Sequence, residues 1–324
     1  MLPEKSYSTA APLTPAPTPQ TFAAEADRRR LSGIALKAVR KIAIEWKLTN
    51  PQSAALLGVS PSTWDRIKRG ERDDEALSQD QLTRASAILG LYKGLQLLFA
   101  DEMSNRWPQL PNRGQIFSGA TPVEAMITAD DETELNALAE LEGATSTRLL
   151  AQDRGFESVP STEFVYGVPH AKFINAAFAY AKPRELNRFN SPGRGAWYAA
   201  LDTATCLDEV AFHMTDFLSR IGDYNAVVEY AEMFASFAGE FLDLRDHADH
   251  VSLHPDKTIG YPAGNALADA VRSRGINGII YPSVRSVGGT CFAILWPHAV
   301  QSVAQGDVYR LTWNGTPSPR RERV

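Results

Sequence analysis

A glutamate, two arginines and an aromatic ring occur close together in the segment NRFNSPGRGAWYAALDTATCLDEVAFH. Arg188 and Arg194 lie in a stretch rich in proline and glycine, and Tyr198 belongs to the short β-like run that follows. A capped helix comes next and places Glu209 about two turns inside it. Arginine, an aromatic ring and one carboxylate that converge from a loop, a strand and a helix are residue types expected in a nucleotide pocket.

A second segment, GIIYPSVRSVGGTCFAILWP, predicts two strands joined by a turn that carries Ser283 and Arg285. Taken singly, these residues are not diagnostic. Glu209 could be a solvated helix carboxylate, and Ser283 could be an ordinary turn residue. Only the two segments taken together predict a nucleotide pocket.

The stretch RDHADHVSLHPD is a different candidate because imidazoles and carboxylates at this density can hold zinc. It has no helical apolar face, and a proline follows its last histidine, which is typical of a polar surface loop. We therefore expect no metal site here. The three histidines are His247, His250 and His254.

Positive charge is concentrated near the N-terminus. Residues 28–72 hold eleven basic and three acidic residues, an excess of eight positive charges, although the whole chain of 324 residues has a formal charge of −5. The rest of the chain therefore carries −13. This division predicts that one segment meets a polyanion and the other does not.

Within the basic segment, Thr49 can cap a short helix that Gly58 ends, and Ser60 can cap the next helix. The pattern is typical of a helix-turn-helix whose second helix lies in the DNA major groove while basic side chains contact phosphates. The alternative is a helical hairpin with a solvated charged face. Trp64 and Ile67 would face the small core. The candidate DNA-binding residues are Ser62, Thr63, Arg66, Lys68 and Arg69.

The order of patterns predicts an α+β chain, with a helical domain before an α/β domain. After residue 78, helices are expected at 79–103, 122–129, 132–142, 171–181, 203–218 and 265–274. Strands are expected at 164–168, 196–200, 226–230, 278–281 and 291–296. The expected domains are a disordered tail (1–25), a helix-turn-helix domain (26–104), a further helical region (105–145), a linker (146–162), an α/β domain (163–312) and a loose tail (313–324).

Composition excludes several classes of protein. No apolar run approaches the roughly 18 residues of a membrane span, and no secretory signal is visible. Two cysteines, Cys206 and Cys291, are too few for a disulfide scaffold. We expect a cytoplasmic protein without a membrane partner.

Residues 28–143 resemble Xre/MbcA/ParS-type antitoxins. The resemblance rests on EWKLTNPQSAALLGVSPSTWDRIKRGE, on LSQDQLTRASAILGLYKGLQLLFAD, and on the W-x3-PN-x4-FSGATPVEAM stretch that starts at Trp107. It implies that residues 105–145 are a toxin-binding region. It also implies binding to operator DNA as a dimer or higher homo-oligomer.

Residues 163–297 resemble the RES domain, which is named for an Arg, a Glu and a Ser. These map onto Arg188, Glu209 and Ser283, and Tyr198 falls on the family's pocket tyrosine. The resemblance implies an ADP-ribosyltransferase-like fold with NAD+ as substrate and no further cofactor. Known members break the nicotinamide–ribose bond with phosphate or water, or transfer ADP-ribose to a protein.

The chain departs from that pattern at one position. Many RES toxins carry an arginine after the first aromatic residue, where this chain has Gly167. The missing cation could come from another residue of the pocket. The candidates are His170, Lys172, Arg194 and Arg285.

The leading interpretation is a single-chain fusion of antitoxin and toxin, in which the first half binds operator DNA and restrains an NAD+-cleaving second half. The restraint could act within the chain or across a dimer. One alternative is a DNA-binding regulator with a catalytically silent, nucleotide-sensing RES half, which Gly167 favours. Another is an ADP-ribosyltransferase that modifies a protein.

Overall fold

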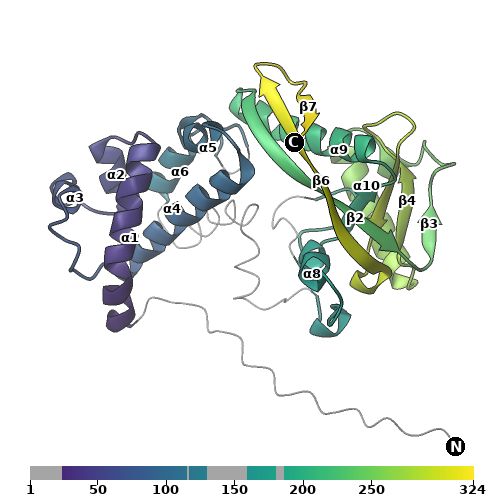
Figure 1. Cartoon of the computed structure of the whole chain (residues 1–324), viewed down its shortest axis with the longest axis horizontal. Helices are drawn as coiled ribbons and strands as arrows, with labels where there is room; N and C mark the ends of the chain where they lie inside the picture. The colour runs from purple at the N-terminus through teal and green to yellow at the C-terminus, as the bar shows by residue number, and fades with distance from the viewer. Residues whose placement is uncertain (1–23, 115–116, 130–158, 180–185) are drawn as a thin grey trace, which may run out of the picture.

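The computed structural model describes residues 24–114, 117–129, 159–179 and 186–324. A group of helices from the N-terminal half lies beside a mixed helix and sheet region from the C-terminal half (Figure 1). The expected helix at 132–142 and nearly all of the expected N-terminal tail and linker lie outside the described residues. In the described ranges, no helix is long and apolar enough for a membrane span.

Capping residues set the starts of the N-terminal helices. Thr49, Ser78 and Thr121 each form a capping box with the Gln or Glu three residues later, and Ser60 accepts a hydrogen bond from the Thr63 amide. The helices expected on either side of the Gly58 turn are confirmed. The elements are α1 (Glu25–Glu45), α2 (Asn50–Leu57), α3 (Pro61–Lys68), α4 (Gln79–Leu98), α5 (Met103–Arg106), a 3₁₀ turn (Trp107–Gln109) and α6 (Pro122–Thr128).

The C-terminal half contains two sheets. One has the strand order β1-β5-β4-β3, with β3 and β4 parallel and the other pairs antiparallel; the second has the order β2-β6-β7 and is antiparallel. Its helices are α8 (Ala171–Ala179), α9 (Thr203–Ile221) and α10 (Lys257–Ser273). Its strands are β1 (Trp197–Ala200), β2 (Asn225–Phe237), β3 (Phe241–Asp243), β4 (Gly278–Pro282), β5 (Thr290–Ile294), β6 (Val300–Asn314) and β7 (Arg320–Arg323).

Several sequence-based expectations are wrong. Residues 164–168 form no strand, because the side-chain amide of Asn175 bonds both the N–H and the C=O of Val165 (3.0 and 2.9 Å) and so takes the groups a neighbouring strand would need. The helix expected at 79–103 ends at Leu98, and the one expected at 265–274 begins at Lys257. The tail after residue 313 is not loose, because β7 pairs with β6.

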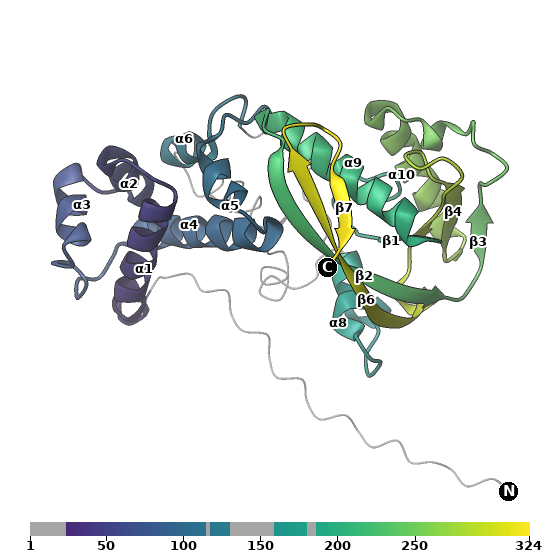
Figure 2. The same cartoon turned by 45° about the horizontal axis from the view of Figure 1, so that its top comes forward.

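The two halves share one apolar core. Phe99 and Trp107 from the helical half belong to the same buried cluster as Leu218 of α9 and Trp313 of β6. Figure 2 shows α5 next to α9 and the β2–β6 pair. A second cluster lies between the first sheet and α10, and a third joins α8 to strands of both sheets. Because α9 contributes to the shared core, it connects the helical half to the rest of the chain.

Candidate active site and nucleic-acid interface

Glu209 and Ser283 meet at the centre of the C-terminal half. Ser283 Oγ donates a hydrogen bond to Glu209 Oε1 at 2.7 Å. The same Oγ accepts the backbone N–H groups of Arg285 (3.1 Å) and Ser286 (2.9 Å). The serine thereby joins the β4–β5 turn to α9 and orients the carboxylate. These two predicted residues lie together although 74 positions separate them.

Asp202 starts the helix that positions Glu209. Its carboxylate accepts hydrogen bonds from N and Oγ1 of Thr205, both at 2.8 Å. These bonds hold the pKa of Asp202 below its usual value, so the cap is ionised at neutral pH. Glu209 follows two turns later, on the same helix face as Phe212.

Arg188 is buried next to the start of α10. Its Nη1 donates to the carbonyl oxygens of Ser252 (2.6 Å) and His254 (3.1 Å), and its guanidinium lies 5.2 Å from the centre of the Tyr261 ring. A Cβ on Gly264 would come within 2.0 Å of the Arg188 carbonyl oxygen, so only glycine allows this approach. The positive charge of Arg188 is therefore fixed by the backbone around it.

Tyr198 fixes the loop that carries Arg188. Its hydroxyl accepts the Phe189 N–H and donates to Asn190 Oδ1, both at 2.9 Å. Burial of the hydroxyl end raises the pKa of Tyr198, so the phenol stays protonated. The residue is nevertheless 39% exposed, which leaves part of its ring accessible to a ligand.

Arg285 also belongs to this site. Its guanidinium lies 3.7 Å from the centre of the Phe212 ring, and its Nη2 donates to the Pro255 carbonyl at 2.8 Å. Burial lowers the pKa of Arg285, and the nearby positive charge of Arg188 lowers it further, which means that the two guanidinium groups act on each other. Lys257 lies on the same ring, with Nζ 5.0 Å from its centre.

Buried neutral groups lie behind Glu209. The Sγ of Cys291 is 3.9 Å from Glu209 Oε1, and burial raises the pKa of this thiol to about 12. Burial also raises the pKa of Tyr281 well above its usual value. Both groups are uncharged at neutral pH, so they form the polar wall of the site while Glu209 supplies its negative charge.

Sequence reasoning did not find Phe212, Tyr261 or Lys257. Phe212 was detectable, because it lies three residues after Glu209 and therefore shares a helix face with it. Tyr261 and Lys257 belong to a helix turn that contains Gly260 and Pro262, so no helical signal preceded residue 265.

The remaining candidate cations lie elsewhere. Arg194 forms an ion pair with Glu163 and stacks over Trp296 at 5.0 Å. His170 packs against the Phe173 ring, 6.0 Å between centres, and Lys172 is exposed at the start of α8. Among the described residues, no contact joins these three side chains to the Glu209 cluster.

The histidine-rich stretch forms a loop and a 3₁₀ turn (Val251–Leu253). His250 Nδ1 bonds to the Ser252 hydroxyl at 2.8 Å, and His254 Nδ1 accepts the Asp256 N–H at 3.1 Å. Over the described ranges, no three His, Cys, Asp or Glu side chains are grouped so as to hold a metal ion.

Helix α3 presents the candidate DNA-binding residues. Trp64 and Ile67 are buried, as predicted, and the remaining residues line the outer face. Lys68 Nζ bonds to Asn50 Oδ1 at 3.0 Å. Ser62 and Thr63 contact the capping Ser60 hydroxyl at 3.0 and 2.9 Å. Two arginines form ion pairs with Glu71, namely Arg66 at 3.6 Å and Arg69.

Family models match both halves of the chain. Residues 25–90 match the antitoxin Xre-like helix-turn-helix domain, and residues 164–314 match the RES domain. The chain combines these two domains. Together they support a toxin–antitoxin fusion. No curated protein matches the chain.

The N-terminal half of the chain, called the Xre-like half below, contacts the RES half directly through residues that follow the matched domain. The Ala100 N–H donates to the Val227 carbonyl at 2.8 Å, and the Arg113 N–H donates to the Arg220 carbonyl at 2.9 Å. The Trp107 and Phe217 rings are stacked 5.8 Å apart at an interplanar angle of 9°. The contacts with Phe217 and Arg220 fall on the C-terminal half of α9, the helix that carries Glu209, and the contact with Val227 falls on β2.

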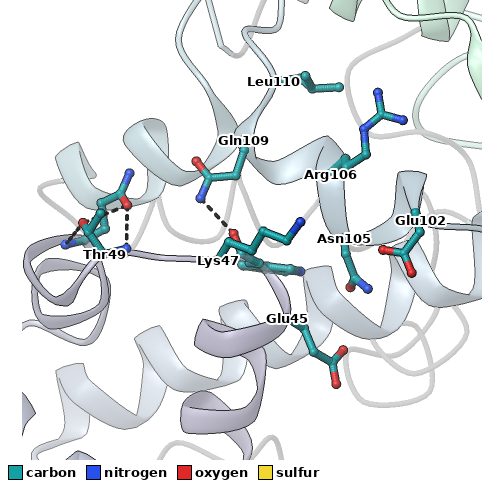
Figure 3. A pocket seen from close by; sticks show the side chains of 10 residues that line it. Glu45, Lys47, Thr49, Glu102, Asn105, Arg106, Gln109 and Leu110 are labelled. Atoms are coloured by element: carbon teal, nitrogen blue, oxygen red, sulfur yellow. Dashed lines mark hydrogen bonds between the residues drawn. The ribbon is translucent and has the colours of Figure 1, made fainter.

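A cavity of about 390 Å³ lies next to this contact, between the end of α1 and α5 (Figure 3). Gln109 Nε2 crosses it to the Trp46 carbonyl at 3.0 Å. Arg106 lines the cavity and also forms an ion pair with Asp223 of the RES half. The cavity therefore shares a residue with the contact between the halves.

Proposed function

We propose that the RES half cleaves the nicotinamide–ribose bond of NAD+, with water or inorganic phosphate as acceptor. The observation that carries the proposal is the Ser283–Glu209 hydrogen bond of 2.7 Å, with Arg285 close both to the same carboxylate and to Arg188. No metal or other cofactor is required, and NAD+ is the substrate.

The residue types match this reaction. Nicotinamide leaves as a neutral molecule from a cationic precursor, so no strong general acid is needed. The ribose carbon becomes oxocarbenium-like, and the Glu209 carboxylate stabilises that charge. Arg188 binds the pyrophosphate. Tyr198 stacks on the nicotinamide with the exposed part of its ring.

Ser283 has a positioning role in this proposal. Its hydroxyl proton is directed at Glu209, and its oxygen already accepts two backbone N–H groups. A direct hydrogen bond from Ser283 to the nicotinamide or its ribose would have to replace the bond to Glu209. We therefore assign the serine to orienting the carboxylate.

The Xre-like half binds operator DNA and inhibits the RES half in this proposal. Support for inhibition within one chain comes from the contacts of Ala100, Trp107 and Arg113 on the RES half. Covalent linkage raises the local concentration of the inhibitory half to about millimolar, so the resting chain is nearly silent. Support for DNA binding comes from the capped α2–α3 pair.

The decisive experiment follows NAD+ by chromatography with the full chain and with a Trp107→Ala variant, each with and without phosphate. We expect the variant to release nicotinamide faster, because the stacked contact with Phe217 is lost. Adding Glu209→Gln should abolish the reaction. Adding Asp269→Asn, a change at an exposed position of α10, should preserve it.

The same assay separates the other functions. If the Trp107→Ala chain binds NAD+ without converting it, the RES half is a nucleotide sensor and the toxin proposal is wrong. That alternative is favoured by Gly167, whose φ of 73° is a left-handed conformation that an arginine adopts only with strain. Radiolabel from NAD+ on a protein band would instead identify an ADP-ribosyltransferase.

A further inference from the structure

Helices α9 and α10 lie side by side but belong to different apolar cores (Figures 1 and 2). The buried side chains of α9, among them Ala211 and Leu218, pack in the core shared with the Xre-like half. Those of α10, among them Ala268 and Val271, pack on the first sheet. In the part of the chain that the structure describes, no buried cluster contains both helices. Apolar packing therefore does not by itself set the position of one helix against the other.

The candidate site takes one charged group from each side of this division. Glu209 is carried by α9, whereas Arg188 is held by the first turns of α10. The Tyr261 ring centre lies 5.2 Å from the Arg188 guanidinium, and a Cβ on Gly264 would lie 2.0 Å from the Arg188 carbonyl oxygen. Any shift of the first turns of α10 against α9 therefore changes the position of Arg188 relative to Glu209.

Asp216 joins the two helices by an ion pair. It follows Glu209 by seven residues, which is about two turns, so the two carboxylates share one face of α9. Asp216 accepts a hydrogen bond at 2.9 Å from Nζ of Lys257, the first residue of α10. Arg220 contacts the same carboxylate at 3.1 Å. Burial raises the pKa of Asp216, but the hydrogen bonds and charges of the two cations lower it by more, so the carboxylate is ionised at neutral pH.

The ion pair is partly shielded from water. The side chains of Asp216 and Lys257 are 36% and 30% exposed, and the Lys257 ammonium also lies 5.0 Å from the centre of the Phe212 ring. A cation that contacts both a carboxylate and an aromatic ring is held more firmly than a lysine at the open surface. We propose that Asp216 is a positioning residue: by holding Lys257, it fixes the first turns of α10, and with them Arg188, against α9. The effect on the substrate rests on the proposed NAD+ reaction.

Asp216 and Ser283 have different consequences in this scheme. Ser283 orients the reactive carboxylate, so its loss should act on kcat. Asp216 acts through Arg188, whose proposed ligand is the pyrophosphate, a group remote from the bond that breaks. The pyrophosphate is bound alike in the ground state and in the transition state, so loss of Asp216 should act on KM.

The first test measures amide hydrogen exchange of the full chain by mass spectrometry, without NAD+. In Asp216→Ala we expect exchange about fivefold faster across residues 257–265, because the first turns of α10 lose their link to α9. Asp216→Glu keeps a carboxylate and should restore slow exchange. Asp269→Ala, which removes an exposed carboxylate paired with Arg272 further along α10, is the matched control and should leave residues 257–265 unchanged.

The second test measures kcat and KM for NAD+ with the same substitutions in the Trp107→Ala chain. Asp216→Ala should raise KM about fivefold at nearly constant kcat, and Asp216→Glu should recover most of the affinity. Lys257→Met removes the other partner of the pair and should raise KM by a similar factor. The two substitutions combined should have no larger effect than either alone, because both break the same contact.

Several results would overturn the proposal. They are unchanged exchange at residues 257–265 in Asp216→Ala, an unchanged KM in a chain that converts NAD+, and a fall in kcat at constant KM, which would place the effect on Glu209. Additive effects of the two substitutions would mean that Lys257 acts without Asp216, and would overturn it as well. If the Trp107→Ala chain fails to convert NAD+, the proposed reaction is wrong, and hydrogen exchange still decides whether Asp216 joins α9 to α10.

Discussion

Replacing Ser283 by alanine tests whether this serine orients the reactive carboxylate. The substitution removes the 2.7 Å hydrogen bond to Glu209 Oε1, in which the acceptor is charged. It also leaves two backbone N–H groups of the β4–β5 turn without their acceptor. A hydrogen bond to a charged group contributes about 1.5–3 kcal/mol. If the bond acts mainly in the transition state, kcat should fall about 10- to 150-fold.

The assay is the rate of nicotinamide release by the Trp107→Ala chain, with kcat and KM measured separately. A positioning role predicts a lower kcat at nearly constant KM, because Ser283 does not touch NAD+ in this scheme. Ser283→Thr keeps the hydroxyl and should recover most of the rate. Ser302→Ala, which removes an exposed hydroxyl bonded to Ser236, is the control.

Two results would refute this reasoning. A kcat within about twofold of the parent for Ser283→Ala would mean that Glu209 is oriented without the serine. A large rise in KM with kcat preserved would mean that Ser283 binds the substrate directly.

Three further predictions concern other parts of the chain. Deleting residues 316–324 removes β7 and the 2.7 Å Arg321–Asp208 ion pair. The Tm in scanning fluorimetry should fall by about 2–4 °C for each kcal/mol of unfolding free energy that is lost, and an unchanged Tm would contradict a stabilising role of β7. If Lys68 contacts a DNA phosphate, Lys68→Ala should reduce the slope of log affinity for operator DNA against log salt concentration by about 0.9. The affinities are measured by fluorescence anisotropy, and an identical slope would exclude the contact. Cys291, with a pKa of about 12, stays protonated as pH rises from 7 to 10, so mass spectrometry should find it resistant to iodoacetamide until denaturant is added.

Local signals in the sequence predicted the N-terminal helices well. The capping residues Thr49 and Ser60, each with a proline in the first turn of its helix, act within four residues and can be recognised without the rest of the fold. The strand at 164–168 failed for the opposite reason. Its apolar residues suit a strand, but Asn175, ten positions away, bonds the backbone groups that a partner strand would use.

The candidate site was partly predictable. Arg188, Glu209 and Ser283 came from the RES resemblance, whereas the contact between Glu209 and Ser283 depends on how the β4–β5 turn meets α9. Lys257 was not predicted, because only tertiary packing brings it to Phe212, 45 positions earlier in the chain. The stacking of Trp107 on Phe217 joins residues 110 positions apart, and no local pattern encodes such a contact.

Helix α9 explains how one half of the chain could act on the site of the other without covering it. Its first turns carry Glu209 and Phe212, and its last turns carry Phe217, against which Trp107 stacks. Eight residues of α-helix span about 12 Å, and a helix of this length moves nearly as a rigid rod. Any shift at Phe217 therefore displaces the Glu209 carboxylate relative to Ser283, which is fixed on the β4–β5 turn. We therefore expect small movements of the Xre-like half to change the geometry of this 2.7 Å hydrogen bond, and with it the geometry of the site.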